Sequence, residues 1–219
     1  MWFLQPGITF NDLITRMLAI LAITFLVLPF HEFAHAWVAH KLGDDTAKNL
    51  GRLTLNPLVH FSTWGAVCLL LFDFGWAKPA PVDIRNLNKP RRDMALIALA
   101  GPLSNILAAM FGGFLLNFVP LIKLGSLISG ISMFIFYYIS INISLAVFNL
   151  IPLAPLDGFK ILEAFIPQRF LIKYYKNLHT ITWVLILLLF LGFFNFPMAF
   201  LERTLYNFVI KITHIPIKF

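Results

Sequence analysis

The chain has 219 residues, of which 59% are hydrophobic and only 12% are charged. An ordinary soluble domain carries about 25% charged residues. A mean hydropathy of +0.83 excludes that class and indicates a polytopic membrane protein. The net charge of +7 does not indicate nucleic-acid binding, because basic residues of membrane proteins collect in cytoplasmic loops. The single cysteine, Cys68, excludes an internal disulfide.

Apolar runs that could cross a bilayer recur four times along the chain. The first, residues 13–30, continues as a helical pattern to about Lys41, and Pro29 is expected to kink it. The other three runs are residues 94–119, 125–150 and 181–196. The sequence therefore predicts an all-α polytopic membrane protein with about four transmembrane helices, interfacial segments such as 158–176, and a single domain over residues 1–219.

A shorter apolar piece lies between the first two spans, at residues 64–76. It is too short to cross a membrane and is flanked by glycine, so a re-entrant element or a β-hairpin fits it better. The segment after it, residues 77–93, is basic and rich in proline. Pro79 and Pro81 exclude a central strand there.

The basic residues predict the orientation of the chain in the membrane. The loops at residues 41–53, 77–93 and 159–178 hold three, five and four Lys or Arg, which is twelve of the seventeen in the chain. If these loops face the cytoplasm, the N-terminus lies outside and residues 64–76 enter and leave on one side. The same topology places the ends of three separate stretches at a similar depth, which is what a shared site requires.

The stretch "HEFAH", residues 31–35, fits the pattern H-E-x-x-H. On a helix, residues four apart share a face, so His31 and His35 can bind one metal ion. Glu32 lies beside that face, where it can act on a metal-bound water. With six histidines in the chain, composition alone would produce this motif only about 0.002 times. Interfacial histidines without a metal are the alternative interpretation.

A catalytic zinc ion takes three protein ligands and keeps an open position for water. The best candidate for the third ligand is Asp157, an acid that follows the third span and two helix-breaking prolines. Spacing alone leaves four alternatives open, namely Asp73, Asp83, His40 and His60.

Four motifs in order, "HEFAHAW", "GWAKPAPVD", "ALAGPLSN" and "AVFNLIPLAPLDG", resemble the site-2 protease family of intramembrane zinc metalloproteases. The similarity covers roughly residues 21–166 and is strongest to the compact prokaryotic branch. The sequence departs from the family where Phe159 follows Gly158 in place of a second glycine, and in "FSTWG" and "PVDIR". These departures remove no ligand and affect the loops only.

The resemblance implies a site and a function. It places one Zn²⁺ per chain on His31, His35 and Asp157, and assigns the catalytic carboxylate to Glu32. Asn149 would hold the substrate or the oxyanion, although a hydrogen bond within its own helix explains it equally well. The implied activity is cleavage of transmembrane helices of other proteins near the cytoplasmic side of a prokaryotic plasma membrane, in regulated intramembrane proteolysis. No PDZ or CBS module is expected.

A helical substrate must unwind before its carbonyl groups can be attacked. A strand edge at residues 64–72 would assist by pairing with the unwound segment.

Two other functions remain open: a membrane transporter of metal ions, and a scaffold that binds metal and client helices without cutting them. The polar residues cluster near one side and no repeat is visible, which disfavours transport. The sequence assigns no oligomeric state.

Overall fold

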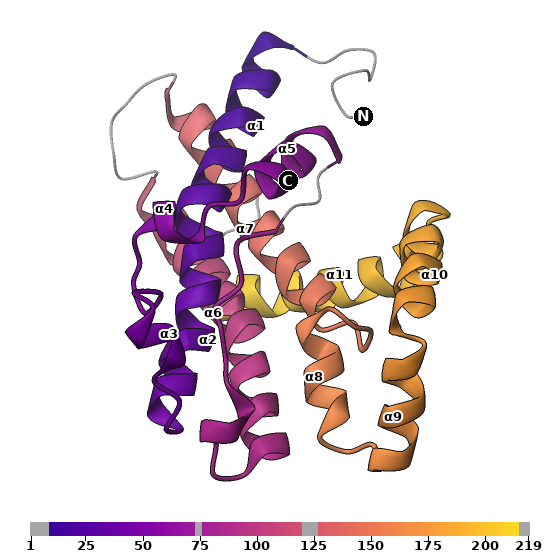
Figure 1. Ribbon diagram of the computed structural model, residues 1–219. Coiled ribbons are helices and arrows are strands. Elements are labelled where there is room, and N and C mark those ends of the chain that lie inside the picture. The colour runs from indigo at the N-terminus through magenta and orange to yellow at the C-terminus, as the bar shows by residue number, and fades with distance from the viewer. Residues whose placement is uncertain (1–8, 73–75, 120–126, 215–219) are drawn as a thin grey trace.

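The computed structural model describes residues 9–72, 76–119 and 127–214, and every regular element in these ranges is a helix (Figure 1). The all-α prediction is therefore confirmed for this part of the chain. The helices are α1 (Phe10–Ala22), η2 (Ile23–Val27), α2 (Leu28–Lys41), α3 (Thr46–Asn49), α4 (Pro57–His60), α5 (Thr63–Phe72), η3 (Ile84–Asn86), α6 (Pro90–Phe118), α7 (Leu127–Asn149), α8 (Asp157–Glu163), α9 (Gln168–Lys176), α10 (Leu178–Phe190) and α11 (Asn195–Thr213).

The N-terminal helix runs without a break from α1 through η2 to the end of α2. Pro29 has no N–H and its ring crowds the preceding turn, so the hydrogen-bond ladder must loosen just before it. A π-helical turn, η2, forms at this point, and in it the N–H of Leu28 donates to the carbonyl of Ile23. The helix ends where predicted, because Gly43 takes a φ of 105° that other residues rarely adopt.

Helices α6 and α7 form the centre of the bundle, and α2 packs against α6 (Figure 1). Glycine allows close approach: a Cβ at Gly112 would lie 3.0 Å from side-chain atoms of Ile139 and Tyr138 on α7. The largest apolar cluster joins α6 and α7 to Val209 of α11, which lies across both helices. The chain is therefore helical close to its C-terminal end, as far as Thr213.

Among the described residues, three helices are long and apolar enough to cross a membrane: Ile20–Lys41, Pro90–Phe118 and Ile128–Asn149. They correspond to the first three predicted spans. The fourth predicted span, residues 181–196, is wrong as a continuous helix because α10 ends at Phe190 and a turn with Gly192 at a φ of 72° precedes α11. The 13 residues of α10 reach only about 20 Å, against a hydrocarbon core of about 30 Å.

The β-hairpin interpretation of residues 64–76 is wrong for its described part, because residues 63–72 form α5. The run "TWGAVCLLLF" lacks the alternation that a half-buried strand needs, and its apolar residues satisfy their backbone in a helix instead. Residues 73–75, which include the alternative ligand Asp73, lie outside the described residues. A re-entrant path for this piece stays a prediction.

Candidate metal centre

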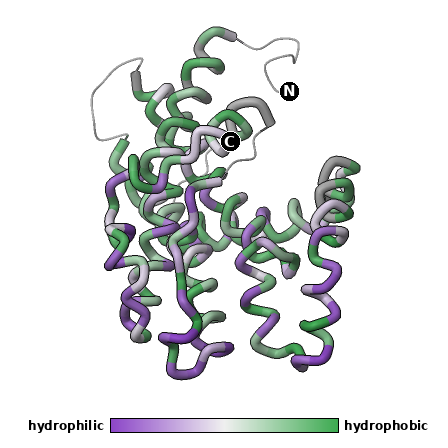
Figure 2. Tube along the Cα trace, viewed as in Figure 1, coloured by the Kyte–Doolittle hydropathy of each residue, from purple (hydrophilic) through white to green (hydrophobic). Residues whose placement is uncertain are grey.

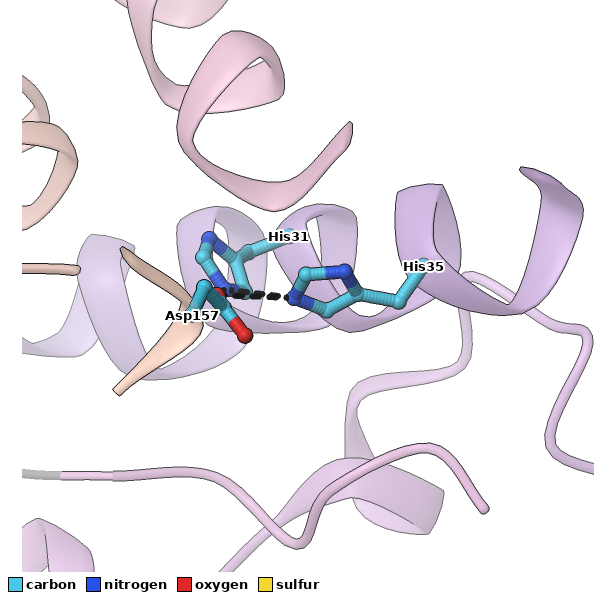
Figure 3. Close-up of side chains that lie close together, drawn as sticks. All are labelled: His31, His35 and Asp157. Carbon is cyan, nitrogen blue, oxygen red and sulfur yellow. Dashed lines mark hydrogen bonds and ion pairs between the residues drawn. The ribbon is translucent and has the colours of Figure 1, made fainter. Parts of the chain in front are cut away.

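His31, His35 and Asp157 come together, although 122 positions separate the second from the third (Figure 3). The Nε2 atoms of the two imidazoles lie 3.0 Å apart. Oδ2 of Asp157 lies 3.2 Å from His31 Nε2 and 3.1 Å from His35 Nε2. All three residues are buried. The structure thus brings together the three residues that the resemblance implied as ligands.

The chemistry of these three donor atoms fits a metal ion. Nδ1 of His35 lies 2.7 Å from the carbonyl oxygen of Ile97. A carbonyl only accepts, so Nδ1 carries a proton and neutral His35 presents a lone pair at Nε2. That lone pair faces a carboxylate oxygen, and a shared cation satisfies both. The separations of 3.0–3.2 Å are close to the edge of about 3.3 Å of a tetrahedron with zinc-ligand bonds of about 2.0 Å.

Gly101 of α6 makes room for the two imidazoles. A Cβ at this position would lie 2.4 Å from His35 Nε2 and 2.5 Å from His31 Nε2. Any larger residue would therefore occupy the space into which the ligand atoms point. This glycine therefore faces the candidate ligands.

Asp157 reaches the site because it is the first residue of α8, which packs against α6 after a tight loop from the end of α7. A Cβ at Gly158 would lie 2.3 Å from the carbonyl oxygen of Leu150, so the D-G pair permits this tight loop. At the other end of α8, Nη2 of Arg91 donates to the carbonyl of Glu163 at 2.7 Å. The helix that carries the acid is therefore held at both ends.

The second carboxylate oxygen of Asp157 has its own partner. Nζ of Lys160 lies 3.2 Å from Oδ1, one helical turn away. The ammonium group of Lys160 favours the ionised form of this carboxyl. The carboxylate is therefore ionised, as a metal ligand must be. Lys160 was not predicted from the sequence, although its i,i+3 spacing from the acid is a readable signal.

Glu32 lies on the wall of the same cavity, which has a volume of about 590 Å³. The backbone N–H of Ala80 donates to Glu32 Oε2 at 2.7 Å. One oxygen of this carboxylate is thus fixed by residues 76–83, a segment without regular secondary structure that we term the strap. The N–H of Ala80 was also missed, because a backbone donor leaves no signature in the sequence.

The strap is tied down on both sides of Ala80. The N–H of Lys78 donates to the carbonyl of His60 at 2.8 Å. The N–H of Asp83 donates to Oδ2 of Asp44, also at 2.8 Å. Asp44 is fully buried at the end of α2. The position of Glu32 therefore depends on anchors at both ends of the strap.

Asn149 lines the same cavity, at the end of α7. Its Nδ2 donates to the carbonyl of Leu145 at 2.9 Å, which is the helical hydrogen bond weighed from the sequence. Both interpretations of Asn149 stay open. Its position on the cavity wall suits a residue that holds the substrate or the oxyanion, and its hydrogen bond suits a residue that only stabilises its own helix.

The described alternative ligands have other partners. His40 pairs with Asp45 through Nδ1, and His60 Nε2 lies 2.9 Å from a backbone carbonyl, that of Thr54. Asp83 pairs with an exposed arginine, and the hydrogen bonds from that guanidinium and its backbone lower the pKa of Asp83 to about 2. None of the three joins the cluster of candidate ligands.

Comparison with known proteins gives this cluster a context. Residues 119–193, which include Asp157, match the family described as Peptidase family M50. A Bacillus subtilis protein named "Putative zinc metalloprotease YwhC" is 45% identical over 151 residues, covering 67% of this chain and 69% of the relative. No solved structure matches this chain.

Two further relatives are also named putative zinc metalloproteases. MJ0611 of Methanocaldococcus jannaschii is 36% identical, over 61% of this chain and 63% of the relative. Rip2 of Mycolicibacterium smegmatis is 31% identical, and the match spans 62% of this chain and about half of that longer relative, 52%. The similarity to site-2 proteases that the motifs indicated is thereby confirmed. The chain belongs to peptidase family M50, the site-2 protease family, and is a zinc metalloendopeptidase.

Proposed function

We propose that this enzyme cleaves transmembrane segments of other membrane proteins, near the cytoplasmic side of a prokaryotic plasma membrane, as a step of regulated intramembrane proteolysis. The observation that carries the proposal is the position of the site. Two of the candidate ligands and Glu32 lie on a helix apolar enough to cross a membrane, and they open onto the cavity of about 590 Å³.

His31, His35 and Asp157 are the residues that would hold zinc, through Nε2, Nε2 and Oδ2. Zinc bound there supplies a Lewis acid that makes a water nucleophilic near neutral pH and polarises a peptide carbonyl. The proton transfers are carried out by Glu32. Because its Oε2 accepts the N–H of Ala80, Oε1 is the atom that takes the proton from water. Oε1 then returns this proton to the nitrogen of the leaving amine.

The strap is the element that we expect to dock the substrate, in place of the strand edge predicted at residues 64–72. Five of its eight residues line the cavity, and the segment has no regular secondary structure. Three of its N–H groups are already used, those of Lys78, Ala80 and Asp83. Pro79 and Pro81 have none. An unwound substrate would therefore pair with the strap mainly by donating its own N–H groups to carbonyls of the strap.

Orientation follows from the distribution of polar residues. Figure 2 shows the hydrophilic positions gathered at the lower end of the view, around the end of α2, the segment before α6, and α8 with α9. This end holds the three basic loops that the sequence assigned to the cytoplasm. The active site would then face the cytoplasm, and water would reach it past the strap.

A substitution of Glu32 by Gln tests the assignment of the proton acceptor. The variant keeps the shape of the side chain but cannot take a proton. Cleavage of a membrane-embedded reporter should fall by about 10²–10⁴-fold, with zinc content unchanged. Retained turnover with full zinc would refute the role given to Glu32.

A substitution of Asp157 by Ala tests the ligand set independently. Zinc content, measured by mass spectrometry of the purified protein, should fall well below one per chain. Undiminished zinc would exclude Asp157 as a ligand.

Membership in a metalloprotease family decides against the transport alternative. The reporter assay excludes the scaffold alternative if the wild-type chain cleaves.

A further inference from the structure

A second cavity lies between the start of α6 and α8. This groove has a volume of about 630 Å³ and is lined by apolar side chains that include Leu96, Leu99 and Phe165. Leu96 and Phe165 are 44% and 80% exposed. Water would be a poor solvent for such a surface, so the groove needs an apolar occupant or a lipid environment.

The mouth of the groove is basic. Lys89, Arg91 and Arg92 line it, and all three are exposed. The one acid of the same turn, Asp93, is buried and already paired, with Arg92 Nη2 at 2.7 Å and the backbone N–H of Lys89 at 2.8 Å. Three cations against one buried carboxylate leave the mouth positive, which suits a phosphate group.

The depth of the groove matches the boundary of a bilayer. Helix α6 has 29 residues and is about 43 Å long, whereas the hydrocarbon core is about 30 Å thick. Its first turn, with Arg91 and Arg92, therefore extends into the headgroup region. Leu96 and Leu99 follow one and two turns deeper, where acyl chains begin. Along the groove, basic side chains are followed by apolar ones, which matches the phosphate headgroup and the acyl chain of a phospholipid.

We propose that this groove is a binding site for one anionic phospholipid, with its phosphate at Lys89 and Arg92 and an acyl chain along Leu96, Leu99 and Phe165. Basic pockets between membrane helices on the cytoplasmic side are suited to such headgroups. The proposal is independent of the protein substrate, and needs only that the chain lies in a membrane.

The bound lipid would also act on the metal centre, because the groove lies between the two helices that complete it. Helix α6 carries Gly101, against which the imidazoles lie, and α8 carries Asp157. A ligand that contacts both helices stabilises the arrangement in which they are packed together. Anionic lipid should therefore slow the loss of zinc.

The test uses the full chain in nanodiscs of phosphatidylcholine that contain a photoactivatable phosphatidylglycerol, or a photoactivatable phosphatidylcholine in the comparison. After illumination, labelled peptides are identified by mass spectrometry. Phosphatidylglycerol should label residues 89–99 and 161–165, and phosphatidylcholine should not. Lys89→Glu should lower that labelling by about fivefold or more. Leu96→Trp, which fills the groove without changing charge, should lower it as well.

Lys173→Glu is the matched control, since Lys173 is another exposed lysine but lies on α9, away from the groove. It should leave the labelling of residues 89–99 intact. Equal labelling by the two lipids, or equal effects of Lys89→Glu and Lys173→Glu, would overturn the proposal and indicate general attraction of anionic lipid. In a second measurement, zinc release to a chelator should be slower in discs with unlabelled phosphatidylglycerol than in discs of phosphatidylcholine alone. Equal release rates would overturn the coupling to the metal centre.

Discussion

Replacing Gly101 by alanine is the most specific test of the metal centre, because it adds one methyl group at the point where the candidate ligand atoms converge. The new Cβ would lie 2.4 Å from His35 Nε2 and 2.5 Å from His31 Nε2, whereas ordinary contact begins at 3.4 Å. The imidazoles must therefore retreat by about 1 Å. Zinc sites tolerate displacements of only about 0.2 Å in ligand distance.

The cheapest way to relieve the clash is rotation of the imidazoles, since they are the ends of side chains. Rotation of His35 would break its hydrogen bond to the carbonyl of Ile97, which is 2.7 Å long. Removing a partner that orients a ligand typically lowers metal affinity 10–100-fold. Displacement of two ligands should lower zinc affinity by at least about 100-fold, or about 2.7 kcal/mol. Alanine favours helix over glycine by roughly 0.5–1 kcal/mol, so the fold should survive.

The assay is competition for zinc with a chromophoric chelator, together with circular dichroism of the same samples. Gly130→Ala is the matched control, because it is the same change in membrane helix α7 and its Cβ would meet nothing within 4 Å. We expect Gly130→Ala to bind zinc like the wild type. If Gly101→Ala kept full zinc affinity and reporter cleavage, the metal would not lie where the two imidazoles and Asp157 meet.

Three further substitutions test what surrounds the site. Lys160→Met should weaken zinc binding about 10–100-fold, because Oδ1 of Asp157 loses its partner; Lys160→Arg should restore it, and an unaffected Met variant would contradict this role. Ala80→Pro removes the N–H that orients Glu32 and should lower turnover about tenfold while zinc content stays constant; loss of zinc would show a wider disturbance.

The third substitution concerns the pH dependence of stability. Burial alone would raise the pKa of the Asp44 carboxyl, but hydrogen bonds from Asn86, Thr46 and the Asp83 backbone lower it below the ordinary 3.8. Such a group stabilises the fold above its unfolded pKa, and the contribution is lost as the pH falls through the folded pKa. Melting temperatures should therefore fall on acidification below about pH 4, and fall less steeply in Asp44→Asn. Parallel curves would refute the anchoring role of Asp44.

The sequence predicted the elements whose signals are local. Long apolar runs identified the helices that can span a membrane, since a bilayer demands about twenty apolar residues and internal backbone hydrogen bonds. The spacing of His31 and His35 predicted a shared face, because helical geometry fixes residues four apart. The prediction of a span at residues 181–196 was wrong, because the apolar composition continues there although the backbone turns at Gly192.

Residue type and spacing thus determined the class of fold, two ligands on one helix, and a glutamate beside them. Only the tertiary structure decided what meets them. From spacing alone, Asp157 was one of five possible third ligands, and the packing of α8 against α6 places it within 3.2 Å of both imidazoles. The space that Gly101 leaves and the N–H of Ala80 become visible only in three dimensions. Each depends on the packing of segments far apart in the chain, which no local pattern encodes.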